Sequence, residues 1–124
     1  MRPRATGLTE QELEIMKLVW QLEAATVRDV YERLLEKRKI AYTTVMTMMK
    51  ILEQKGHLVK TTEDRAHLYR PSRPREEVLG GMVTEFVDRV FNGAAEPLLM
   101  HLVENEKLTE GDLDEIKKML RRKK

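Results

Sequence analysis

Apolar residues recur at helical spacing in the first part of the chain, in segments that begin at recognisable capping residues. The first segment follows Thr9, where Glu12 completes a capping-box pattern, and it is expected to end near Leu22. The second segment follows Thr26, with Asp29 in the equivalent position. The pattern therefore predicts two short amphipathic helices before the first basic run.

The next part of the chain combines a third helix with a hairpin. Apolar spacing predicts a helix over residues 42–55, stopped at Gly56, which suits the left-handed position after a helix. Two short strands are expected over residues 57–62 and 66–70, joined by the polar turn 63–65. Three helices followed by a hairpin are typical of a winged helix-turn-helix domain.

Beyond the second strand the pattern becomes entirely helical. A long amphipathic segment over residues 75–91 ends at Asn92 and Gly93, a dipeptide that favours a turn. A shorter helix starts near Pro97, and a third follows the capping residue Thr109. The expected fold class is mainly α with one small β-hairpin.

This change in pattern predicts a winged helix-turn-helix domain over residues 1–73 and a three-helix domain over residues 74–124. So small a helical domain closes poorly on itself, and its long helix has an apolar stripe wider than one neighbouring helix needs. We expect a second copy of the chain to cover the remainder, while docking onto the chain's own first domain is the alternative. The side chains expected at the dimer seam are Val78, Leu79, Met82, Val83, Phe86, Val90, Leu98, Leu102, Leu113, Ile116 and Leu120.

The net charge is only +2, but basic residues are unevenly placed. Residues 1–73 carry 14 Lys or Arg against 10 Asp or Glu, whereas residues 74–124 carry 9 against 11. Residues 37–73 alone hold 9 basic and 3 acidic groups. A local basic patch favours a nucleic-acid contact, because phosphate binding depends on local charge. An ordinary solvated surface is the alternative.

Projection of the third helix at about 100° per residue separates two faces. The face expected to pack inward carries Val45, Met48, Met49 and Leu52. The opposite face carries Thr43, Met46, Thr47, Lys50 and Gln54, with Thr44 at its edge. This face has no acidic residue, and its hydroxyl and methyl groups suit phosphates, base edges and thymine methyls. A merely solvated face is the alternative, but Met46 and three threonines are unfavourable choices for one.

The hairpin turn offers a second candidate contact. Arg65 at the turn, with Lys60 and His67 nearby, is placed to reach a backbone phosphate or the minor groove. Glu63 and Asp64 beside it would repel phosphate, so Arg65 is expected to make the contact at the tip. An exposed turn with a local Asp64–Arg65 interaction is the alternative. Lys60 and Arg65 join the third helix as predicted DNA contacts.

The sequence gives little support for catalysis, metal binding or membrane insertion. The chain has no cysteine, which excludes disulfides and thiolate metal sites and fits a reducing cytosol. No apolar run is long enough to span a bilayer, and no signal-peptide stretch is present, so a cytoplasmic protein is expected. The histidines are scattered, and His101 with Glu104 supplies only two ligands where a metal site needs more. We expect no enzyme, metal or cofactor.

Three stretches resemble the penicillinase and methicillin-resistance repressors and their copper-responsive relatives. These stretches are residues 8–20, the run AYTTVMT at 41–47, and DRAH at 64–67 followed by Tyr69. The middle run is the most specific, and the similarity continues into the C-terminal helices. The resemblance implies a homodimer with N-terminal winged-helix domains and an interwound C-terminal dimerisation domain, which binds a dyad operator and blocks transcription.

The resemblance also implies residue roles. The recognition-helix positions fall on Thr43, Thr44, Met46, Thr47 and Lys50, and the wing position falls on Arg65. Staphylococcal-type members are cleaved at an Asn–Phe bond, in a pathway triggered by a membrane-bound sensor metalloprotease. This chain has His101 and Leu102 there, and it lacks the C-terminal cysteine pairs of the copper-responsive relatives.

The sequence thus predicts a homodimeric repressor that binds a palindromic operator with its third helix in the major groove until an unknown signal relieves it. Two recognition helices about one DNA turn apart would read such a site. The alternatives are a winged-helix protein-interaction adaptor and a small-molecule-responsive regulator with a pocket between its domains. The expected partners are operator DNA and a second copy, with a membrane sensor protease as the remaining candidate.

Overall fold

The computed structural model describes residues 7–123 and divides into two compact units, Met1–Met82 and Val83–Lys124. The elements are mainly helices with one hairpin, as the sequence predicts. The division falls later than the boundary expected after residue 73, because the start of the long helix packs on the first unit. No helix within residues 7–123 is both long and apolar enough to cross a membrane.

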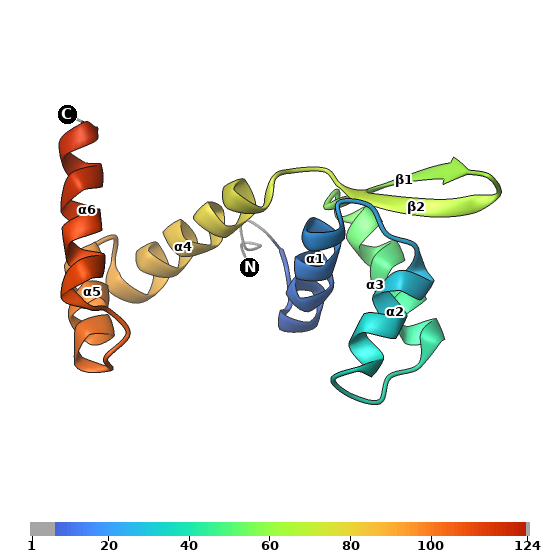
Figure 1. Ribbon diagram of the computed structural model, residues 1–124, viewed down its shortest axis with the longest axis horizontal. Coiled ribbons are helices and arrows are strands. Elements are labelled where there is room, and N and C mark those ends of the chain that lie inside the picture. Colours follow the sequence, from blue (N-terminus) through green and yellow to red (C-terminus); the bar gives the residue numbers. More distant parts are fainter. Residues whose placement is uncertain (1–6, 124) are drawn as a thin grey trace. The chain divides into compact units, whose positions relative to one another are not determined.

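The first unit contains three helices and the hairpin (Figure 1). The helices are α1 (Glu10–Leu22), α2 (Val27–Leu35) and α3 (Tyr42–Gln54). The strands are β1 (Leu58–Glu63) and β2 (Ala66–Pro71), and the hairpin they form projects beyond the helices. We call this hairpin the wing. All five elements lie within about one residue of their predicted bounds.

The capping boxes begin the first two helices as predicted. The Thr9 hydroxyl accepts the Glu12 backbone N–H at 3.1 Å, and the Glu12 carboxylate accepts the Thr9 N–H at 2.9 Å. Thr26 and Asp29 repeat this exchange at the start of α2, at 3.0 and 2.9 Å. Each box satisfies two backbone donors that a helix start leaves without partners.

The core of the first unit lies between the three helices and the wing. Its fully enclosed side chains come from one face of each helix; they are Ile15, Met16, Val19, Val30, Leu34, Val45, Met49 and Leu52. Leu58 and Tyr69 extend the core onto the wing, and Val78 closes it with 4% exposure. This packing leaves the opposite side of α3 free for another role.

The wing has a shorter turn than the sequence suggested. Glu63 pairs with Ala66, so Asp64 and Arg65 alone form the turn, and the expected three-residue turn is wrong. Their φ values of 49° and 68° are both left-handed, the geometry of a two-residue hairpin that twists with its strands. At the other end, Tyr69 exchanges two backbone hydrogen bonds with Ala25, which ties the wing to the segment between α1 and α2.

The long helix α4 (Arg75–Phe91) starts in the first unit and continues into the second. It ends at Asn92 and Gly93, both with positive φ, as the sequence predicts. The helices α5 (Ala95–Glu104) and α6 (Glu110–Arg122) follow. A third capping box, formed by the residues before and within the first turn of α6, confirms the predicted start.

The second unit has no enclosed core of its own. None of its described residues, 83–123, is buried in the single chain. Its more exposed large apolar side chains are Val83, Phe86, Val90, Leu99, Met100, Val103, Met119 and Leu120. The rings of Phe86 and Phe91 meet edge-on within this unit, at a centroid distance of 5.8 Å. This unit therefore presents apolar surface to water.

Candidate nucleic-acid interface

The outer face of α3 is available to a partner. Val45, Met49 and Leu52 are fully enclosed, which fixes the rotation of the helix about its axis. The side chains that this rotation leaves exposed are Thr43, Thr44, Thr47, Lys50 and Gln54. Met46 lies half-buried among them. The structure thus brings the predicted residues of this helix together on one surface.

The start of α3 differs electrostatically from the other helix starts of the first unit. Its N-cap is Ala41, whose side chain makes no capping hydrogen bond, and its first turn contains no acidic residue. The helices α1 and α2 instead have a carboxylate in the first turn. The positive end of the α3 dipole is therefore not compensated locally, which favours an approaching anion.

A groove of about 500 Å³ lies between the start of α2, the outer face of α3 and the wing. Its lining residues are Thr26, Val27, Arg28, Tyr42, Met46, Lys50, Lys60, Ala66, His67 and Tyr69. Among these described residues none is acidic. Lys60 from β1 lines this groove together with Met46 and Lys50 from α3. The contacts predicted separately on the wing and on α3 therefore belong to one surface.

The wing places Lys60 and Glu63 on opposite faces. Lys60 and Tyr69 are cross-strand partners, so they share a face, and His67 lies on it two residues before Tyr69. Glu63 lies on the opposite face, where Arg70 donates to it at 3.3 Å. Because Arg70 engages this carboxylate away from the groove, Glu63 opposes phosphate less than the sequence suggested.

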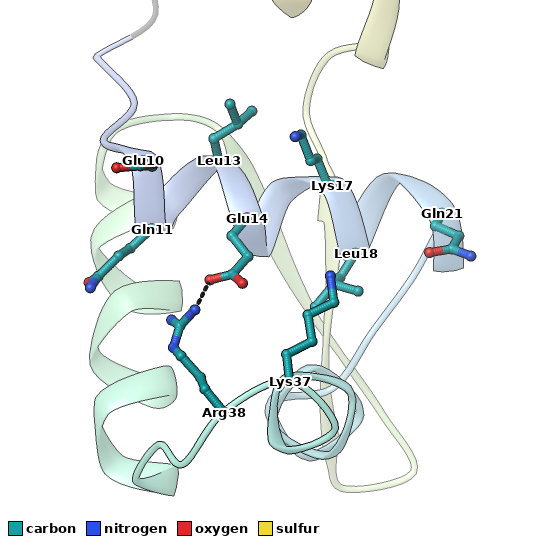
Figure 2. A pocket seen from close by; sticks show the side chains of 9 residues that line it. All are labelled: Glu10, Gln11, Leu13, Glu14, Lys17, Leu18, Gln21, Lys37 and Arg38. Carbon is teal, nitrogen blue, oxygen red and sulfur yellow. Dashed lines mark hydrogen bonds and ion pairs between the residues drawn. The ribbon is translucent and has the colours of Figure 1, made fainter.

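Several basic residues counted in the patch have partners within the chain. Lys55 donates to the Glu12 carboxylate at 2.8 and 3.0 Å. Arg38 pairs with Glu14, and Figure 2 shows Lys37 and Arg38 pointing toward α1. The hollow of about 720 Å³ that Figure 2 displays shares no lining residue with the groove and mixes carboxylates with cations. These basic side chains therefore contribute less to the interface than the count of basic residues over 37–73 implied.

Arg28 and Tyr42 are groove residues that the sequence reasoning missed. The Arg28 guanidinium lies over the Tyr42 ring, 5.5 Å from its centroid, and Tyr42 meets Tyr31 edge-on at 5.4 Å. The start of α2 is adjacent to α3 only after folding, so periodicity could not reveal this neighbour. The only signal in the sequence for this contact is that Arg28 lies two positions after the capping residue Thr26, in the first turn of α2.

The residues proposed for a dimer seam divide between the two units. Val78 is buried in the core of the first unit, and Met82 packs against that core. Val78 is therefore unavailable to a second copy, which corrects that part of the prediction, whereas Met82 is only partly buried. The others remain at least partly exposed; they are Leu79, Val83, Phe86, Val90, Leu98, Leu102, Leu113, Ile116 and Leu120. Their role in dimerisation stays a prediction.

Comparison with known proteins identifies the family. Residues 8–122 match the family described as "Penicillinase repressor". The chain belongs to the penicillinase repressor family. It is 36% identical over 111 residues to the transcriptional regulator BlaI of Mycobacterium tuberculosis, a similarity that spans 88% of this chain and 80% of the relative. The resemblance inferred from three short stretches is thus confirmed over most of the chain.

Solved structures of the repressor BlaI match more than half of the chain. The DNA-binding domain of the repressor BlaI is 25% identical with a TM-score of 0.53, over 61% of this chain and 93% of that domain. Monomeric Bacillus licheniformis BlaI, in complex with the blaP half-operator, is 27% identical with a TM-score of 0.50, over 56% and 85%. The winged-helix fold predicted from the sequence is confirmed.

Proposed function

We propose that this chain is a transcriptional repressor that binds operator DNA with the outer face of α3 in the major groove. The observation that carries the proposal is the exposure of Thr43, Thr47 and Lys50 on a face without carboxylates. A family relative of matching fold is described in complex with a half-operator, which supports the same use of this domain. Occupation of the operator would exclude RNA polymerase sterically.

We also propose that the repressor acts as a homodimer. The exposed apolar side chains of the second unit, such as Phe86 and Val90, gain about 25 cal/mol for each Å² that a second copy covers. Two α3 helices held about one DNA turn apart would read a palindromic site, and linking the two contacts would raise the affinity far above that of one domain. The proposal includes no catalytic step, no metal and no cofactor, and it assigns the protein to the compartment that holds the DNA.

A membrane sensor protease stays a candidate partner. His101 is exposed and Leu102 half-buried on α5, where staphylococcal-type repressors carry the cleaved Asn–Phe pair. We propose that any protease acting here recognises a different bond or a different sequence.

The test is selection of bound genomic fragments, followed by titration of the selected duplex and a random duplex across a salt series. We expect the selected duplex to bind more tightly, and the logarithm of the binding constant to fall linearly with the logarithm of salt concentration for both. A protein-interaction adaptor would bind neither duplex. That result would overturn the proposal.

A further inference from the structure

The groove between α2, α3 and the wing extends beyond the residues expected to contact DNA. Arg28 comes from α2 and His67 from β2, and both line it together with Lys50 and Lys60. We infer that this groove holds a segment of the DNA sugar–phosphate backbone, with Arg28 as a phosphate contact on its α2 wall. The inference rests on the proposed function and adds α2 to the interface.

The charge of the groove fits a polyanion. Arg28, Lys50 and Lys60 bring three cationic groups from three elements, and His67 adds a fourth nitrogen-bearing side chain. The described residues that line the groove include no carboxylate. Its apolar floor, which includes Met46 and other half-buried side chains, matches the uncharged sugar rings between successive phosphates. A single small anion would not use the full length of this surface.

Arg28 is restrained without using its hydrogen-bond donors. Its guanidinium carbon lies over the Tyr42 ring, 5.5 Å from the ring centroid, which is a cation–π contact and uses no N–H donor. The Tyr42 ring is in turn fixed edge-on against Tyr31. A cation–π contact leaves the N–H groups of Arg28 able to donate, and a guanidinium can donate to two phosphate oxygens together.

The carboxylate of Glu32 forms only a weak ion pair with Arg28. Glu32 lies 3.8 Å from the guanidinium, and the two side chains are 62% and 66% exposed. Exposed pairs of this kind contribute little, because water and salt screen them. A DNA phosphate that enters the groove can therefore replace Glu32 at small cost. On the wing, Thr62 contacts the His67 ring at 3.2 Å and holds it in place beside Lys60.

The inference is tested with Arg28→Gln in the full-length protein, against Arg33→Gln as a matched control. Arg33 is an exposed residue of the same helix that does not line the groove. We expect R28Q to bind selected and random duplexes roughly tenfold more weakly, because a charged hydrogen bond is lost. The salt slope should become shallower by about 0.9 for each copy bound, hence by about 1.8 for the proposed homodimer. R33Q should match the wild type in both.

Two further variants keep the result interpretable. Arg28→Lys keeps the charge but not the paired donors, so it should restore the slope and only part of the affinity. Tyr42→Leu removes the aromatic ring beneath Arg28 and should weaken DNA binding. This loss of affinity should be smaller when Tyr42→Leu is added to the R28Q protein than when it is added to the wild type. Thermal unfolding by circular dichroism checks that each variant folds.

The outcomes separate the two proposals. Wild-type affinity and slope in R28Q would overturn the backbone contact while leaving the repressor function in place. Loss of binding to the selected duplex alone would mean that Arg28 reads bases, and it would also overturn the inference. Competition by inorganic phosphate beyond that of chloride at equal ionic strength would assign the groove to a small anion. Failure of the wild type to bind any duplex would overturn the repressor function itself.

Discussion

Lys55, just after the end of α3, donates to both carboxylate oxygens of Glu12 in α1, at 2.8 and 3.0 Å. Lys55 also donates to the carbonyl oxygen of Gly7 at 2.8 Å, and the Glu12 side chain is only 6% exposed. One ammonium group thus joins the predicted recognition helix to the helix that begins the domain. This charge serves the orientation of α3 and is unavailable to DNA.

The first prediction concerns the stability that this ion pair provides. Glu12→Gln should lower the free energy of unfolding by about 1–2 kcal/mol, because a buried charge-assisted hydrogen bond is lost. Gln still accepts the Thr9 N–H, so the capping box is preserved and urea unfolding reports on the Lys55 pair. The matched control is Glu14→Gln, whose pair with Arg38 is more exposed and should contribute less than about 1 kcal/mol. Equal losses would contradict a special role for Glu12.

The same pair predicts a pH dependence. Burial raises the pKa of Glu12, but the hydrogen bonds from Lys55 and Thr9 and the Lys55 charge outweigh it and hold the pKa below the ordinary 4.5. The folded state therefore binds this proton more weakly than the unfolded state. The stabilisation is complete above the ordinary pKa and is lost as the pH falls through the lowered folded value. Wild type should lose more stability than E12Q upon acidification below about pH 5, and parallel curves would contradict this.

The wing turn makes a prediction about function and strain. Arg65 has a φ of 68°, a conformation that glycine adopts freely and that costs an L-residue about 1 kcal/mol. Arg65→Gly should leave the unfolding free energy unchanged or raise it by up to about 1 kcal/mol, since relief of strain is offset by the greater entropy of unfolded glycine. Affinity for DNA should nevertheless fall, with a shallower salt slope, if Arg65 contacts a phosphate.

The neighbouring residue supplies the control for Arg65. Asp64 has a φ of 49°, so Asp64→Gly makes the same kind of backbone change at the same turn. It removes a negative charge, and DNA affinity should rise or stay constant. Equal affinities for R65G and the wild type would remove the wing tip from the interface.

The helices were predictable because their signals are local. The capping residues Thr9, Thr26 and Thr109 each act on the residue three positions later, and apolar spacing then defines the buried face. The rotation of α3 follows from Val45 and Met49 alone, which is why its outer face could be predicted. These features depend on a few neighbouring residues.

Contacts between distant segments were not predictable in this way. Tyr69 pairs with Ala25 through backbone atoms, which carry no sequence pattern. Arg28 reaches the groove only because α2 packs beside α3. Val78 continues the apolar spacing of α4 without a break, yet the first unit covers it. Periodicity shows that a face is apolar, but it does not show which surface covers it.

A fourth prediction separates base reading from phosphate binding on α3. Thr47→Ala removes a hydroxyl and should relax the preference for one base pair while changing affinity for random duplex little. Lys50→Ala should weaken binding to every duplex and reduce the salt slope by about 0.9 for each copy bound, hence by about 1.8 for a dimer. Titration of the selected duplex and single-base variants across the salt series measures both. If neither variant differs from the wild type, another face of the domain binds DNA.

The last prediction tests the seam between two copies. Phe86, which is 40% exposed in the single chain, lies against Phe91 on the apolar surface of the second unit. Phe86→Glu would place like charges from two copies in an apolar seam, so light scattering should show a shift from dimer to monomer at equal protein concentration. Affinity for a palindromic duplex should fall toward that for a half-site, because the second contact is no longer linked to the first. Thr84→Glu adds the same charge at an exposed position of the same helix and should leave the dimer intact. An F86E protein that remains dimeric, or a T84E protein that dissociates equally, would show that the seam lies on a different face.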